Sequence, residues 1–207
     1  MSSEESLGSR VTGAMSGLIL QADPWPWAYH PRLLSEPDSG ALCESFPSGL
    51  LRRASSADQG GKTYRLRTAV LGAVMPLPDP WRALYACLTS RSYRQRLEAV
   101  TQRPLGDCAL EVSIWEYGPQ DWLGPHVDKP DKVVTQIIYL SAGWQAGWGG
   151  RLLILPGPGE PPSAALAPMP GASSVVIRSD TSWHAVEPVD AGANACRRSV
   201  TAIFRAA

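Results

Sequence analysis

Residues 108–114 read CALEVSI, and this stretch decides the fold. Leu110, Val112 and Ile114 alternate with polar residues, a period of two that is typical of a strand with one buried face. Short apolar runs follow it, separated by Gly, Pro and Asp, at residues 133–140, 152–155, 174–177, 183–189 and 200–204. Short strands at this spacing predict a β-sandwich or barrel in the C-terminal half.

The N-terminal half has helical features instead of alternation. Residues 35–46 predict a short helix that starts near Asp38, and residues 81–100 carry an interrupted helical face that predicts two helices. Residues 1–17 are rich in Ser and Gly and predict a frayed terminus, while the composition of residues 52–63 favours a flexible loop. We therefore expect this half to pack against and support a core formed by the C-terminal half of the chain.

Length and composition favour a single domain. The chain has 207 residues, of which 44% are hydrophobic, which is enough for one sizeable core and too little for two. We expect residues 1–107 to form an N-terminal extension with supporting helices. Residues 108–207 are expected to form the β-rich core that holds the active site. The expected fold class is α+β, mainly β.

Charge and cysteine content restrict the partners and the location. Lys plus Arg equals Asp plus Glu at 19 each, so the chain offers no global field for nucleic acid or anionic lipid. None of the four cysteines forms a C-x-x-C pair, which favours reduced thiols in a cytoplasm. No run approaches the roughly 18 apolar residues of a membrane span. We expect a cytoplasmic protein, and its oligomeric state stays open.

His126-Val127-Asp128 is the first candidate for a functional site, a metal-binding motif. On a strand, residues i and i+2 point to one face, so the imidazole and the carboxylate would converge. His184, from a distant strand, would complete a set of two histidines and one carboxylate that leaves the opposite positions open, as in non-haem Fe(II) oxygenases. A bare H-x-D is nevertheless common, and His184 beside Trp183 also fits an ordinary core histidine.

The last predicted strand, residues 197–204, is the second candidate for a functional site. Arg197, Ser199 and Thr201 share one face, and a cation with two hydroxyls suits a carboxylate, which an arginine fork binds bidentately. Tyr139, on the strand expected at residues 132–141, would donate a further hydrogen bond. We choose Arg197 over Arg198 because a shift of one residue exchanges the two faces of a strand. The alternative is a solvated arginine at the start of the strand.

These motifs together resemble the prolyl 4-hydroxylase-like branch of the 2-oxoglutarate/Fe(II) dioxygenases. The resemblance covers roughly residues 108–205, with the motifs in the order and near the spacings of that family. They are Tyr117-Gly118, His126-Val127-Asp128-x-Pro130, Lys132-x-x-Thr135, Ile138-Tyr139-Leu140-Ser141, Trp148-Gly149-Gly150-Arg151-Leu152, Pro170-Gly171, Ser179, His184-x-Val186-x-Pro188-Val189 and Arg197-x-Ser199.

The resemblance implies a double-stranded β-helix, a distorted jelly roll, with helices packed on one sheet. It implies Fe(II) bound by His126, Asp128 and His184, with 2-oxoglutarate chelating the metal through its C1 carboxylate and keto oxygen. Arg197 would anchor the distal carboxylate of this co-substrate. The other side chains implied to contact it or line its pocket are Tyr117, Tyr139, Ser199 and Thr201.

The implied reaction is O2-dependent decarboxylation of 2-oxoglutarate to succinate and CO2, coupled to hydroxylation of an unactivated C–H bond. The expected substrate is a small amino-acid-like molecule, a natural-product intermediate or a peptide. One alternative is a nucleic-acid alkyl-lesion demethylase of the same superfamily, for which Arg205 would be a second inward arginine. Another is a non-catalytic cupin-like binding protein. Zero net charge argues against the first, and the intact metal and arginine motifs argue against the second.

Overall fold

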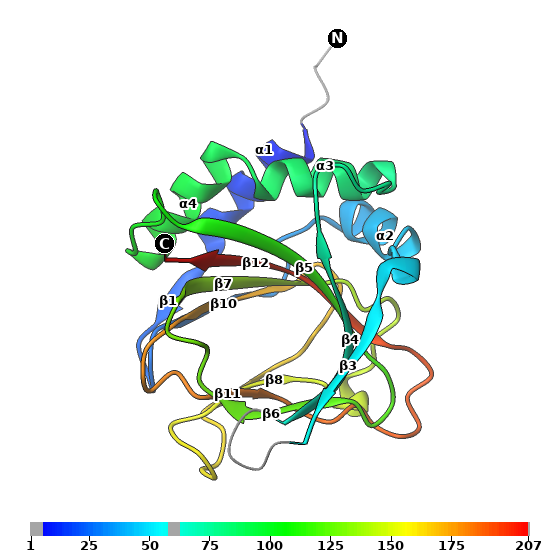
Figure 1. Ribbon diagram of the computed structural model, residues 1–207, viewed down its shortest axis with the longest axis vertical. Coiled ribbons are helices and arrows are strands. Elements are labelled where there is room, and N and C mark those ends of the chain that lie inside the picture. Colours follow the sequence, from blue (N-terminus) through cyan, green and yellow to red (C-terminus); the bar gives the residue numbers. More distant parts are fainter. Residues whose placement is uncertain (1–5, 58–62, 207) are drawn as a thin grey trace.

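One strongly curled antiparallel sheet forms the centre of the computed structural model, which describes residues 6–57 and 63–206 (Figure 1). The strands are β1 (Ile19–Gln21), β2 (Trp27–His30), β3 (Arg52–Ser56), β4 (Tyr64–Leu71), β5 (Ala109–Tyr117), β6 (Trp122–His126), β7 (Lys132–Tyr139), β8 (Leu152–Ile154), β9 (Ala164–Leu166), β10 (Ser173–Ile177), β11 (His184–Val186) and β12 (Arg197–Arg205). They pair in the order β1-β2-β10-β7-β12-β5-β4-β6-β11-β8-β9, with β3 beside β4. Curling brings β6, β8 and β11 opposite β5, β7 and β12, which gives the two walls of a double-stranded β-helix. The predicted fold class, mainly β with supporting helices, is confirmed.

Helices cover the outer face of one wall. They are α1 (Leu7–Ala14), α2 (Glu36–Glu44), α3 (Asp79–Leu88) and α4 (Arg91–Thr101), and short 3-10 turns occur at Met15–Gly17, Ser48–Leu50 and Ala146–Trp148. Figure 1 shows α1, α3 and α4 above β5 and β12. Helix α2 begins after Ser35, whose hydroxyl accepts the amide N–H of Asp38 as an N-cap. In the described part of the chain, no helix has the length and apolar character needed to cross a bilayer.

Strand β12 lies between the core under the helices and the interior of the curled sheet. Val200, Ala202 and Phe204 are buried beneath the helices, where the Phe204 ring stacks on Tyr93 with centroids 6.4 Å apart. Residues of the other parity, beginning with Arg197, face the interior of the curled sheet. Because β12 lies between β5 and β7, hydrogen bonds on both edges hold this register.

Two local predictions are wrong. Residues 7–14 form α1 rather than a frayed terminus, and Arg10 of this helix makes two hydrogen bonds with the carboxylate of Asp38 in α2. Residues 52–56 form β3 rather than a loop, because they pair along their whole length with β4. Residues 58–62 of that predicted loop lie outside the described residues. In both cases the stabilising partner lies outside the segment itself, so the composition of the segment does not reveal it.

The N-terminal half contributes strands as well as helices. Strand β2 pairs with β10, so β1 and β2 extend one edge of the sheet. Strand β4 pairs with β5 on one wall and with β6 on the other. The β4 pairing therefore joins the two walls and sets how the metal-motif strand β6 faces β5.

Candidate active site

A cavity lies between the two walls of the curled sheet. Strands β5, β6, β7, β8, β11 and β12 all contribute to its lining, and most of the surface that faces the cavity is apolar. The lining residues are Trp115, Tyr117, Leu123, His126, Asp128, Lys132, Thr135, Ile137, Leu152, His184, Val186, Arg197, Ser199, Thr201 and Ile203. An apolar cavity with a few convergent polar groups is the usual form of a ligand site, so those polar groups define its chemistry.

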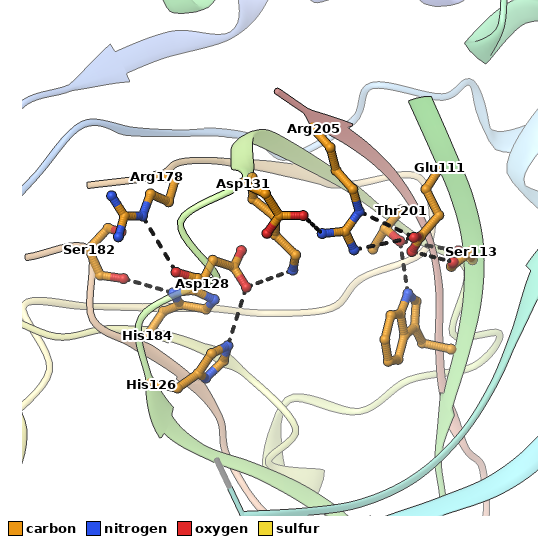
Figure 2. Close-up of polar contacts among 12 residues, drawn as sticks. Glu111, Ser113, His126, Asp128, Asp131, Arg178, Ser182, His184, Thr201 and Arg205 are labelled. Carbon is orange, nitrogen blue, oxygen red and sulfur yellow. Dashed lines mark hydrogen bonds and ion pairs between the residues drawn. The ribbon is translucent and has the colours of Figure 1, made fainter. Parts of the chain in front are cut away.

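Three side chains converge in this cavity (Figure 2). His126 ends β6 and His184 begins β11, and antiparallel pairing places these two residues opposite each other. Asp128 lies just beyond the end of β6, with Oδ1 3.6 Å from Nε2 of His126. One potential ligand atom from each of the three lies within 4.8 Å of the others, and all three residues are buried. The sequence prediction brought these residues together correctly, although Asp128 follows the strand rather than lying on it.

Backbone carbonyls orient both imidazoles. Nδ1 of His126 is 3.0 Å from the carbonyl oxygen of Gly124. Nδ1 of His184 is 2.9 Å from the carbonyl oxygen of Ser182 (Figure 2). A carbonyl oxygen only accepts hydrogen bonds, so each Nδ1 carries the proton and each Nε2 keeps its lone pair. Metal-bound histidines are oriented in this way in proteins, so the triad fits a divalent metal ion.

Asp128 is held as a carboxylate. Burial on its own would raise its pKa, but the adjacent imidazoles of His126 and His184 and the ammonium of Lys132 hold that pKa well below its ordinary value. Nζ of Lys132 donates to Oδ1 of Asp128 over 2.7 Å. Two imidazoles and one carboxylate beside an open cavity form the donor set of non-haem Fe(II) sites.

Arg197 lies in the same cavity and is only 2% exposed. Its Nε donates to the carbonyl oxygen of Gly150 over 2.7 Å, and its guanidinium lies 4.9 Å and 5.2 Å from the ring centroids of Tyr117 and Tyr139. Within the part of the chain that the structure describes, it makes no ion pair with a carboxylate. A buried cation costs free energy unless an anion pairs with it, so this end of the cavity fits a ligand carboxylate.

The hydroxyl groups predicted around that arginine lie at different depths. Ser199 Oγ is 3.5 Å from the guanidinium, and Thr201 Oγ1 accepts a 2.8 Å hydrogen bond from Nε1 of Trp115; both residues line the cavity. Tyr139 lies behind the guanidinium instead, and its hydroxyl forms a 2.7 Å hydrogen bond with Ser174. Tyr139 therefore supports the arginine from outside the cavity lining.

Three polar or aromatic lining residues received no role from the sequence. Trp115 and Thr135 lie on the inward faces of β5 and β7, so strand alternation applied to the whole cavity would have found them. Lys132 belongs to the motif Lys132-x-x-Thr135 of the family resemblance, but strict alternation along β7 would place it with Val134 on the helix side. The structure places it in the cavity instead.

Comparison with known proteins points to one superfamily. Residues 112–205 match the family model of the 2OG-Fe(II) oxygenase superfamily. No curated protein matches the chain. A Pseudomonas putida prolyl-4-hydroxylase is 18% identical, with 95% of this chain and 99% of that chain covered and a TM-score of 0.66. A Trichoplax adhaerens prolyl hydroxylase, solved with a hypoxia inducible factor peptide fragment, is 16% identical, with 96% and 90% covered and a TM-score of 0.68.

A viral collagen prolyl hydroxylase from Paramecium Bursaria Chlorella virus-1, solved with 2OG, has the same architecture. It is 15% identical, with 87% of this chain and 96% of that chain covered and a TM-score of 0.59. At these identities the likeness to the solved structures establishes a shared fold and does not identify a substrate.

Proposed function

We propose that this chain, in which residues 112–205 match the family model of the 2OG-Fe(II) oxygenase superfamily, is a 2-oxoglutarate-dependent dioxygenase that hydroxylates an unactivated C–H bond of a small amino-acid-like, natural-product or peptide substrate. Its cofactor is Fe(II), and its co-substrates are 2-oxoglutarate and O2. One observation carries the proposal. A potential metal triad and a buried arginine without a carboxylate partner among the described residues line the same cavity.

We assign the metal to His126, Asp128 and His184. Their three ligand atoms are close enough to bind one ion, and the carbonyl contacts of both imidazoles present Nε2 to it. Iron bound here supplies O2 activation coupled to decarboxylation of 2-oxoglutarate. The remaining histidine, His30, accepts the backbone N–H of Arg32 through Nδ1 and lies outside the cavity lining.

We assign the distal carboxylate of 2-oxoglutarate to Arg197. Nε is already bound to Gly150, so the two terminal nitrogens of the guanidinium are the donors that face a ligand. Ser199 and Thr201 supply hydroxyls from the same face of β12. Burial raises the pKa of Tyr117 to about 12 against the opposing effect of Arg197, so its phenol stays protonated and can donate to the co-substrate.

The demethylase alternative lacks support in this geometry. Arg205, the second arginine it would need, pairs with Glu111 over 3.2 Å and with Asp131 over 2.8 Å (Figure 2). Two carboxylates thus neutralise it, and the formal net charge of the chain is zero. A nucleic-acid phosphate would have to displace these acids, which makes this region a poor phosphate site.

Two measurements test the proposed function. Under nitrogen, adding Fe(II) and then 2-oxoglutarate should produce the visible absorption of the iron chelate. With O2 and a panel of amino acids, peptides and their derivatives, succinate should form in step with a product that is heavier by one oxygen atom. A chain that binds neither Fe(II) nor 2-oxoglutarate would disprove the function. Binding of both without succinate from any panel member would favour the non-catalytic alternative.

A further inference from the structure

Strand β7 carries one extra residue near its start. Phe204 of β12 is opposite Val134, but the next residue, Arg205, is opposite Lys132, so Val133 has no partner in that register. This is a β-bulge, a feature that changes the face on which a side chain lies. Regular alternation would place Lys132 beside Val134, under the helices. The bulge instead places Lys132 in the active-site cavity.

Lys132 leaves the cavity with an excess positive charge. The charged residues in the lining are Asp128, Lys132 and Arg197, with both histidines neutral. Fe(II) and the dianion of 2-oxoglutarate cancel each other, so the loaded cavity keeps one positive charge. An uncompensated charge in a buried site is costly. A third molecule that brings one negative charge would neutralise the loaded site.

Two polar groups in the cavity lining have unused hydrogen-bonding capacity. Oγ1 of Thr135 is buried and has no hydrogen-bond partner among the described residues. The ammonium of Lys132 has three N–H donors, and within the described ranges its one acceptor is Oδ1 of Asp128. Buried polar groups are almost always satisfied, so an unsatisfied one in a ligand cavity indicates a ligand atom. A carboxylate accepts from both an ammonium and a hydroxyl, and a neutral amide would leave the charge uncompensated.

Apolar side chains lie on the strands beside these groups. Ile203 is directly opposite Thr135 across the β12–β7 pair, and Trp115 pairs with Ser199 across the β12–β5 pair. Both Ile203 and Trp115 line the cavity. This part of the cavity therefore presents one cation and one hydroxyl next to an apolar wall, which suits a molecule with a carboxylate and a hydrophobic body.

We propose that Lys132 and Thr135 form the substrate-binding subsite, and that the substrate is a carboxylate-bearing, amino-acid-derived molecule. Its acid group binds Lys132 and Thr135, and its hydrophobic body lies against Trp115 and Ile203. This inference rests on the proposed function, because it assumes that the metal and 2-oxoglutarate occupy the rest of the cavity. Since Lys132 also contacts Asp128, an acid bound to it lies close to the metal, which limits oxidation to carbon atoms near the acid.

The test uses the intact chain loaded with Zn(II), which has no redox chemistry, and saturated with N-oxalylglycine, a non-reactive mimic of 2-oxoglutarate. The probes are matched pairs, the N-acetyl derivatives of leucine, proline and phenylalanine as free acids and as primary amides. Isothermal titration should show at least one acid binding about tenfold or more tightly than its amide, the value of one charge-assisted hydrogen bond. The absence of a preference for the acid in all three pairs would overturn the proposal.

Substitutions locate the subsite. Lys132→Met should abolish the preference for the acid, and Thr135→Val should reduce it several-fold. Lys129→Met is the control, because it removes the same charge from an exposed position three residues away, outside the cavity lining. If Lys132→Met weakens Zn(II) binding but leaves the preference intact, Lys132 only positions Asp128 and the proposal fails. Failure of the unmodified chain to bind N-oxalylglycine would instead count against the proposed function itself.

Discussion

Replacing Arg197 should selectively weaken the binding of 2-oxoglutarate. Arg197→Ala removes a guanidinium that is 2% exposed and that has no carboxylate partner among the described residues. The hydroxyl of Ser199, 3.5 Å from this guanidinium, remains as a weaker, uncharged donor. The metal triad belongs to other elements, so iron binding should be retained.

The size of the effect follows from the donors that face the ligand. Nε is bound to Gly150, which leaves the two terminal nitrogens for a carboxylate. One hydrogen bond to a charged group contributes about 1.5–3 kcal/mol net, which is roughly a 10- to 150-fold change in affinity. Arg197→Ala should therefore raise the dissociation constant of 2-oxoglutarate by at least roughly that factor. Arg197→Lys keeps the charge without the planar fork and should show a smaller loss.

The assay is an anaerobic titration of the Fe(II)-loaded protein with 2-oxoglutarate, read by the visible absorption of the chelate. Arg198→Ala is the matched control. Arg198 faces the helix side, where it pairs with Glu116 over 2.9 Å and lies over the ring of Phe46. Its removal should lower stability and leave 2-oxoglutarate affinity unchanged. The reasoning is refuted if Arg198→Ala weakens binding strongly while Arg197→Ala does not.

Three further predictions concern the metal, the N-terminal helix and the core. His184→Ala should lose bound iron by elemental analysis while His30→Ala retains it, and the reverse result would rule out the triad. Asp38→Asn should lower the melting temperature at pH 7 by a small amount, because the half-buried pair with Arg10 contributes about 1 kcal/mol or less. The hydrogen bond from Arg10 lowers the pKa of Asp38, so this stabilisation is present above the unfolded pKa of about 3.9 and is lost as the pH falls through the lower folded value. The melting temperatures of the two proteins should therefore converge once the pH falls below the lowered folded pKa of Asp38, and a difference that does not change with pH would contradict this origin. Phe204→Ala should cost about 3–5 kcal/mol in urea unfolding, because the ring is fully buried against Tyr93, and a loss under about 1 kcal/mol would contradict this packing.

Alternation along strands was enough to predict the main walls of the sheet and the orientation of β12. Val200, Ala202 and Phe204 are apolar, while Arg197 and Ser199 are polar. Only one register places the apolar set under the helices and the polar set in the cavity. A shift of one residue would expose one set and bury the other without partners, and the structure has the register that satisfies both.

The metal triad could also be predicted, but for a different reason. Few residue types bind Fe(II), and the chain has only three histidines, so the choice was small. The pairing of His126 with His184 across β6 and β11 required the fold, because these residues are far apart in the chain. The resemblance to a known family supplied that long-range information.

Other features depend on tertiary structure alone. Residues 7–14 and 52–56 become regular structure because a helix or a strand outside each segment contacts them. Tyr139 was expected to contact the co-substrate, which stays a prediction; the fold places its ring against the guanidinium of Arg197 and its hydroxyl against Ser174.

The position of Lys132 shows most clearly what sequence periodicity cannot predict. Its own sequence neighbourhood places it with Val134 on the helix side, and nothing in residues 132–139 indicates an extra residue in the strand. The bulge at Val133 lies in the pairing of β7 with β12, whereas the pairing of β7 with β10 is regular from Val134 to Ile138. Periodicity describes a strand in isolation, whereas a bulge is a property of the pair of strands, so only the assembled sheet decides which side chains reach the cavity.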